Sequence, residues 1–240
     1  MMIFVKIFNK IKHFIHFVII FACRNAKRLE MKKKFTDKQI MILDVAEELI
    51  ARKGYEGTSV RDICSKAGIN VAMISYYFGS KEKMLAYLYQ YRVQKTRENF
   101  AEFAHTIRDG KPEMQVKEII RFIIGQMFRY KYFHGFVKQE MRNTDIMDDE
   151  LQEFYKMAVE KFDEVIRKGV GSGVFQFAPH AEDVLTMVIG SALFVIRNKK
   201  FYEQYLPNSN DRNYLEESEK KIRTTLYQTI FSLLGYQPEI

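Results

Sequence analysis

Apolar residues recur at helical spacing along most of the chain, beginning with a helix that opens after Phe35 and closes at Gly54. Thr36 and Gln39 have the spacing of a capping box, and Phe35 and Ile40 have that of a hydrophobic staple. The buried stripe of this helix is expected to consist of Ile42, Val45, Ala46, Leu49 and Ile50. The pattern therefore predicts a helix whose two ends are both defined by the sequence.

Two shorter helices joined by a tight turn are predicted within residues 58–83. Ser59 and Asp62 form a second capping box at the start of the first one. Gly68 follows its last apolar position, where a left-handed backbone favours glycine, and Asn70 can cap the next helix. The apolar positions facing between these two helices are Val60, Ile63 and Ala67 in the first and Ile74 and Phe78 in the second.

A helix, a glycine turn and a second helix make a helix-turn-helix, here residues 59–78, which lays its second helix in the DNA major groove. Residues 70–77 would then form the surface that reads the bases. Tyr76 and Tyr77 occupy adjacent helical positions, which point about 100° apart. At least one of these two rings is therefore expected to face outward, although both residue types are also common in cores.

The rest of the chain is predicted to be helical, and no segment has the pattern of a strand. Ser80 caps the next helix, and Pro112 suits a first helical position after the turn at 109–112. The predicted helices run from Lys81 past Phe100, then over 116–128, 132–141, 148–168, 179–197 and 214–234. Residues 169–173 are expected to form a flexible turn and 207–213 a polar loop. The fold class is therefore all-α, an N-terminal three-helix domain followed by a helical bundle.

The charge of the chain changes along its length. The formal charge of +8 divides into +5 over residues 1–30, +3 over residues 31–90 and zero over the remaining 150 residues, which carry 22 charges of each sign. The composition, 47% apolar and 28% charged, is ordinary for a folded protein. This division suits a DNA-binding head on a body with another task.

Candidate chemistry is sparse. Cys23 and Cys64 are too few for a disulfide framework or a zinc site, and a reducing interior is the expected compartment. His105, His134 and His180 are isolated, so no metal ligand set is expected. The glycine-rich run 169–173 lacks phosphate-loop spacing and follows a helix. No enzyme and no cofactor are predicted.

The first thirty residues allow several interpretations. Residues 14–23 are apolar behind a lysine-bearing start, but this run is about half the ~20 residues that a spanning helix needs. Met31 could be the true start, with 1–34 as a leader, or the segment could form an amphipathic helix. The remaining alternative is a membrane-associated or structural DNA-binding protein with 1–23 as its anchor.

A dense set of motifs identifies residues 35–91. They are the helix 42–49, Gly54-Tyr55, Thr58 to Ile63, Ala67-Gly68-Ile69 and Tyr76 to Glu82. This pattern resembles the DNA-binding domain of the TetR (tetracycline-repressor) family of transcriptional regulators. Residues 92–240 resemble the family in length, helical content and the turn at 173–175.

The resemblance implies a cytoplasmic homodimer that binds a palindromic operator in double-stranded DNA, in the usual case as a repressor. Residues 179–197 and 214–234 would form a four-helix dimer interface. Residues 92–240 would also hold a small-molecule effector, but the sequence does not identify the effector, its ligand-binding residues or the direction of its effect.

The resemblance also implies specific DNA contacts. They fall on Ser59, Arg61, Asn70, Val71, Ala72, Met73, Ser75, Tyr76, Tyr77 and Lys81. Arg61 would contact a base, while Tyr77 and Lys81 would contact phosphates. Ser75 stands where the family commonly has a phosphate-binding tyrosine, and its shorter hydroxyl puts that contact in doubt. A solvated surface charge is the alternative reading of Arg61, and capping is the primary role expected of Asn70.

Overall fold

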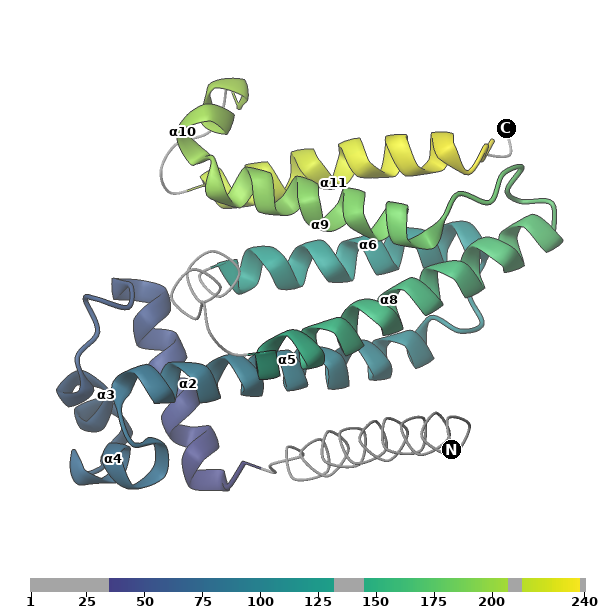
Figure 1. The fold of residues 1–240 in the computed structure, drawn as a ribbon. Helices are drawn as coiled ribbons and strands as arrows, with labels where there is room; N and C mark the ends of the chain where they lie inside the picture. The colour runs from purple at the N-terminus through teal and green to yellow at the C-terminus, as the bar shows by residue number, and fades with distance from the viewer. Residues whose placement is uncertain (1–34, 132–144, 207–212, 238–240) are drawn as a thin grey trace, which may run out of the picture. The chain divides into compact units, whose positions relative to one another are not determined.

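The computed structural model describes residues 35–131, 145–206 and 213–237. The leader 1–34 with the possible start at Met31, the predicted helix 132–141 and most of the predicted loop 207–213 lie outside them. Throughout the described ranges the regular structure is helical, without a strand (Figure 1). The predicted all-α class is confirmed.

Three helices make up the predicted head: α2 (Asp37–Lys53), α3 (Val60–Ala67) and α4 (Ala72–Phe78). Both predicted capping boxes form. Thr36 Oγ1 accepts the Gln39 N–H at 3.3 Å, and Ser59 Oγ accepts the Asp62 N–H at 3.0 Å while the Asp62 carboxylate accepts the Ser59 N–H at 2.9 Å. Gly68 ends α3 with a φ of 64°, the left-handed conformation that the sequence predicted there.

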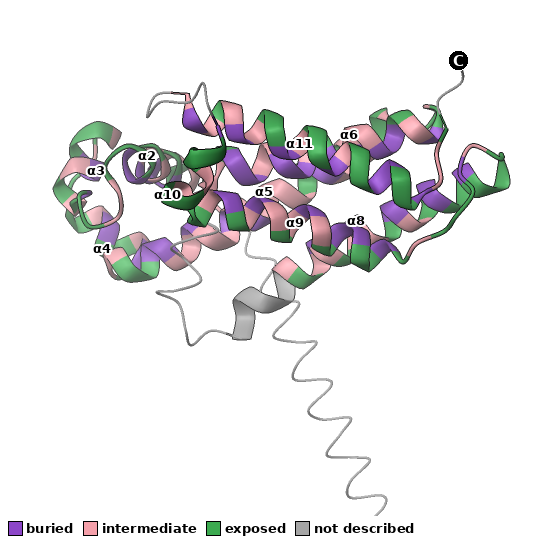
Figure 2. Ribbon diagram, turned by 90° about the horizontal axis from the view of Figure 1, so that it is seen from above, coloured by how far each residue is buried: buried purple, intermediate pink, exposed green. Residues whose placement is uncertain are grey.

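The remaining helices are α5 (Lys81–Thr106), α6 (Pro112–Arg129), α8 (Asp145–Gly171), α9 (Ala181–Arg197), α10 (Lys199–Tyr202), the 3-10 turn η2 (Glu203–Tyr205) and α11 (Tyr214–Leu233). In the bundle α6 packs against α8, α9 and α11, and α5 packs against α8. Each long helix turns its buried positions toward its neighbours and its exposed positions away (Figure 2). In the described part of the chain, no helix combines the length and apolarity needed to cross a membrane.

The structure corrects the prediction of a flexible turn over 169–173. Helix α8 continues to Gly171, so only the last part of this run is a turn. A Cβ on Gly169 would lie 2.0 Å from Phe175 Cδ2, which shows that the ring packs directly onto the helix backbone. The absence of a side chain at Gly169 therefore allows the segment after α8 to pack closely against this helix.

Two short helical segments follow residue 198, and the sequence pattern did not predict them. Both α10 and η2 are too short to show an apolar period. They carry three aromatic rings, of which those of Phe201 and Tyr205 have centroids 5.2 Å apart.

Candidate nucleic-acid interface and effector pocket

The inner faces of α3 and α4 are apolar and buried. Ile63 in α3 and both Ile74 and Phe78 in α4 are at most 3% exposed. Because these side chains point into the head, the opposite face of α4 is left in solvent. Val71 and Ser75 are exposed there, as the helix-turn-helix pattern predicted.

Asn70 caps α4, as predicted, because its Oδ1 accepts the Ala72 N–H at 2.9 Å. The helix itself begins only at Ala72, so Asn70 and Val71 belong to the turn before it. The segment expected to read DNA is thus part turn and part helix. Asn70 remains exposed, so its Nδ2 group is accessible to a base or a phosphate.

Arg61 and Ser59 both lie at the start of α3, but they differ in their hydrogen bonding. Arg61 is exposed and has no hydrogen-bond or ion-pair partner in the described residues. Ser59 is engaged by Asp62, whose carboxylate accepts the Ser59 hydroxyl at 2.7 Å. The bonds from the Ser59 backbone and hydroxyl lower the pKa of Asp62, because they stabilise its charged form.

The two tyrosines of α4 confirm that at least one ring faces outward. Tyr76 is 80% exposed and Tyr77 is partly buried, with ring centroids 5.0 Å apart in an edge-to-face arrangement. Most of the Tyr76 side chain is therefore open to solvent. Sequence position alone could not distinguish which of the two it would be.

Lys81 has a structural partner that the sequence did not reveal. Its ammonium donates to the Tyr55 carbonyl at 2.8 Å and lies 3.9 Å from the centroid of the Tyr55 ring. Both contacts are with uncharged groups of Tyr55, and they hold the Lys81 ammonium at the N-terminus of α5. Helix N-termini favour anions, which makes this end of α5 suited to a phosphate.

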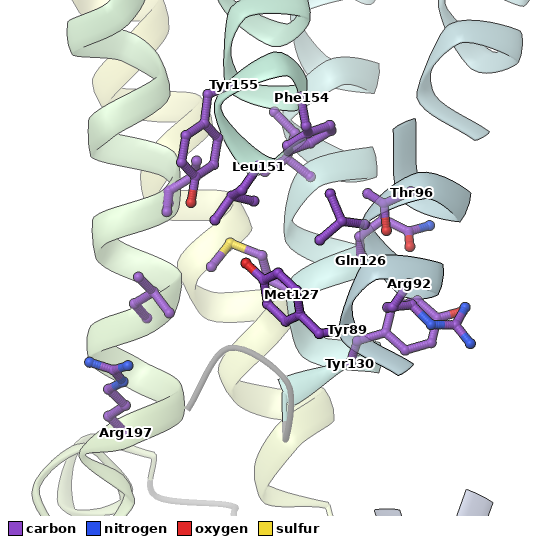
Figure 3. A pocket seen from close by; sticks show the side chains of 14 residues that line it. Tyr89, Arg92, Thr96, Gln126, Met127, Tyr130, Leu151, Phe154, Tyr155 and Arg197 are labelled. Atoms are coloured by element: carbon purple, nitrogen blue, oxygen red, sulfur yellow. The ribbon is translucent and has the colours of Figure 1, made fainter. Parts of the chain in front are cut away.

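A pocket of about 250 Å³ lies within the bundle (Figure 3). Four helices line it with Tyr89, Arg92, Val93 and Thr96 of α5, Ile123, Gln126 and Met127 of α6 with Tyr130 at its end, Leu151, Phe154 and Tyr155 of α8, and Ile189, Leu193 and Arg197 of α9. Among the described residues, its charged lining residues are two arginines, and no carboxylate belongs to the lining. The sequence alone does not reveal this set, since a lining drawn from four separate helices has no spacing of its own.

Arg92 connects the pocket to the head. Its side chain is 14% exposed, its guanidinium forms an ion pair with Glu47 of α2, and it lies 4.2 Å from the centroid of the Tyr130 ring. Burial lowers the pKa of Arg92. The neighbouring Tyr91 faces the same helix, and burial together with the Asp44 carboxylate raises its pKa to about 12.

The described residues contain no group of three or more His, Cys, Asp or Glu side chains that could hold a metal ion. The polar groups of the described pocket lining are its two arginines, the Gln126 amide and the hydroxyl groups of its threonine and tyrosines.

Two family models match the chain in separate regions. Residues 42–88 match "Bacterial regulatory proteins, tetR family", and residues 112–226 match "Tetracyclin repressor-like, C-terminal domain". The first match falls on α2 to α5, and the second on the bundle with the pocket. Together they cover more than half of the chain.

Individual proteins agree with these matches. The probable HTH-type transcriptional regulator YttP of Bacillus subtilis is 28% identical over 127 residues, which are 53% of this chain and 60% of YttP. A TetR/AcrR-family regulator from Thermobifida fusca has the same fold, with a TM-score of 0.61, 22% identity and coverage of 85% of this chain and all of that one.

A third protein, AibR, was solved in complex with isovaleryl coenzyme A and operator DNA. It aligns with a TM-score of 0.55 and 17% identity over 84% of this chain and all of its own. Its likeness to this chain is one of fold. With the helix-turn-helix geometry and the two family matches, the conclusion is that this chain belongs to the TetR family of transcriptional regulators.

Proposed function

We propose that the protein is a cytoplasmic repressor that binds an inverted-repeat operator as a homodimer and changes its affinity when a small molecule occupies the bundle. This role is regulatory and requires no catalytic group. The observation that carries it is the exposed face of the helix-turn-helix, where Arg61, Asn70 and Tyr76 project from a head whose inner face is closed by apolar packing.

The proposed DNA contacts divide into base and backbone contacts. Arg61, exposed and unpaired within the described structure, suits a bidentate contact to guanine. Val71 and Ala72 are exposed and apolar, which suits thymine methyl groups. Lys81 supplies a positive charge for a phosphate, and Tyr76 offers a hydroxyl that can replace the one Ser75 is too short to provide.

Uncovered apolar surface on α9 and its continuation supports a dimer. Phe194, Phe201 and Tyr205 are each about half exposed, and their rings follow one another with centroids 5.8 and 5.2 Å apart. A Cβ on Gly190 of α9 would meet nothing within 4 Å, so this part of the helix can accept a close neighbour. Contiguous exposed apolar groups of this kind mark interaction surfaces.

The proposed effector binds the 250 Å³ pocket. AibR, which has the same fold, was solved in complex with both isovaleryl coenzyme A and operator DNA. An effector can shift the protein only through a difference in its affinity for the DNA-bound and free states. An effector that releases the operator must bind the free state more tightly than the DNA-bound state.

The proposal is tested by selecting bound duplexes from a random pool. The expected product is an inverted repeat whose half-sites are about 10 base pairs, or ~34 Å, apart, because two recognition helices related by a dimer axis meet the same face of the duplex. Enrichment of no sequence, with equal affinity for heparin and duplex, would refute the proposal.

The Arg61→Ala variant tests the assignment of the base contact. It should weaken binding to the selected duplex by about 1–3 kcal/mol and relax the preference at one position in each half-site. The matched control is Arg121→Ala, which removes an exposed arginine of α6 and should leave binding unchanged. An equal loss on random DNA would instead make Arg61 a backbone contact.

A further inference from the structure

Two polar atoms in the lining of the pocket have no hydrogen-bond partner. Within the described residues, Arg92 Nε and Gln126 Oε1 are buried from solvent and unpaired. Buried polar groups in folded proteins are nearly always satisfied, because leaving one unpaired costs free energy. Two such atoms in one lining indicate that a polar ligand completes the site.

The charge of the lining specifies what that ligand carries. Arg92 of α5 and Arg197 of α9 lie on opposite sides of the pocket, and Phe154 and Tyr155 lie toward its other end (Figure 3). Arginine forms its strongest hydrogen bonds with carboxylates and phosphates. The remaining wall is mainly aliphatic and aromatic, which suits an apolar body.

The volume of the pocket limits the size of the ligand. A cavity of about 150 Å³ holds a benzene ring, so 250 Å³ holds roughly ten non-hydrogen atoms. A monocarboxylic acid of medium chain length has that size.

The partner of Arg92 in the present structure is Glu47 of α2. Both side chains are 14% exposed, and Glu47 Oε1 is itself buried without a partner in the described part of the chain. The pair is therefore incompletely satisfied on both sides. A competing charge can displace one member of such a buried pair, because both charged groups have already lost their hydration and their hydrogen bonds are incomplete.

We propose that the effector is a medium-chain carboxylic acid whose carboxylate binds Arg92 in competition with Glu47, so that filling the pocket weakens the tie between α5 and α2. The Gln126 Nε2 group donates to the same carboxylate, and the apolar body lies against Phe154, Leu151 and Met127. This inference rests on the proposed function, because α2 belongs to the head that binds DNA. Its chemical part, preference for an anion, is independent of DNA.

Binding is measured first by calorimetry on the full-length protein without DNA. The probes are octanoate, with about ten non-hydrogen atoms, 1-octanol as its neutral counterpart and octylamine as its cationic counterpart. Octanoate is expected to bind best, and Arg92→Gln should weaken it by at least about tenfold while leaving 1-octanol unchanged. The matched control is Arg167→Gln, an exposed arginine of α8 that is paired with Asp163 and lies outside the pocket.

The competition with Glu47 makes a prediction of opposite sign. Glu47→Gln removes the competing charge, so this variant should bind octanoate several-fold more tightly than the unmodified protein. Circular dichroism shows whether each variant is folded. The proposal would be overturned if the unmodified protein bound octanoate and 1-octanol equally, and bound acids of six and ten carbons no better than the matching alcohols. It would also be overturned if Arg92→Gln bound octanoate as tightly as the unmodified protein does.

The coupling is then measured on the selected operator duplex. Octanoate should lower DNA affinity in the unmodified protein and have a smaller effect in Glu47→Gln, where the tie to α2 is already cut. Anion-selective binding with no change in DNA affinity would overturn the competition while leaving DNA binding intact. Absence of DNA binding under all conditions would instead refute the proposed regulator and leave the anion preference to be judged by calorimetry alone.

Discussion

At the scale of single residues, side chains proposed to bind DNA also hold the head together. Ser59 serves the capping box of α3, Asn70 caps α4, and Lys81 binds the Tyr55 carbonyl at 2.8 Å. A substitution at any of them changes a local structure as well as a surface group. Binding data on such variants therefore need a stability measurement beside them.

Lys81→Ala should weaken binding to all duplexes and flatten the dependence of log affinity on log salt by up to about one unit, because one phosphate contact is lost. It should also lower the melting temperature, since the bond to Tyr55 is removed. Binding is followed by fluorescence anisotropy between low and physiological salt, and melting by circular dichroism.

Lys83→Ala is the matched control for that experiment, as Lys83 is exposed in the same turn of α5 and has no carbonyl partner of this kind in the described structure. It should change melting little. A Lys81→Ala protein with an unaltered salt slope would remove the phosphate role and leave only the structural one.

At the scale of elements, close packing decides where a helix ends. Helix α8 continues through Gly169 although glycine is unfavourable in helices, and Phe175 covers the backbone at this point. The following turn returns the chain to α11, with the Gln176 and Phe177 N–H groups donating to the Leu234 carbonyl at 2.9 and 3.1 Å. The glycine run is thus part of the core packing.

Gly169→Ala should destabilise the protein by about 1–3 kcal/mol, because the added methyl group overlaps the Phe175 ring. Gly171→Ala is the control at the end of the same helix, where a Cβ would meet nothing within 4 Å. It should be neutral or stabilising by up to about 1 kcal/mol. Urea unfolding measures both, and equal stability of the two variants would refute the packing argument.

At the scale of the whole molecule, the proposed function requires two copies. The basic residues gather toward the N-terminal end, while residues 91–240 have no net charge and carry the uncovered aromatic rings of α9, α10 and η2. A neutral apolar surface favours association of two bodies, and the basic heads favour DNA.

Phe194→Asp should convert the proposed dimer to monomers, because a charge would be buried at the apolar contact. Sedimentation velocity at micromolar concentration measures the change, and affinity for the inverted repeat should fall toward that of a single half-site. Met114→Asp places the same charge at an equally exposed position of α6 and should leave the dimer intact. A Phe194→Asp protein that sediments as a dimer would move the interface elsewhere.

The sequence by itself determined the features that depend on neighbours along the chain. The capping boxes at Thr36 and Ser59, the left-handed Gly68 and the apolar faces of the helices follow from local backbone chemistry and periodicity. The helix-turn-helix is built from such local signals, so its location and its outward face could be predicted from the residues.

Only the tertiary structure decided the features that join distant positions. The pocket takes its lining from four helices, and Arg92 forms an ion pair with Glu47, which lies 45 residues earlier in the sequence. Phe175 packs onto Gly169, within a glycine run that forms the end of a helix. These outcomes depend on which helix faces pack together and at what distance. That choice is made by the whole core at once, so no spacing within a single helix can encode it.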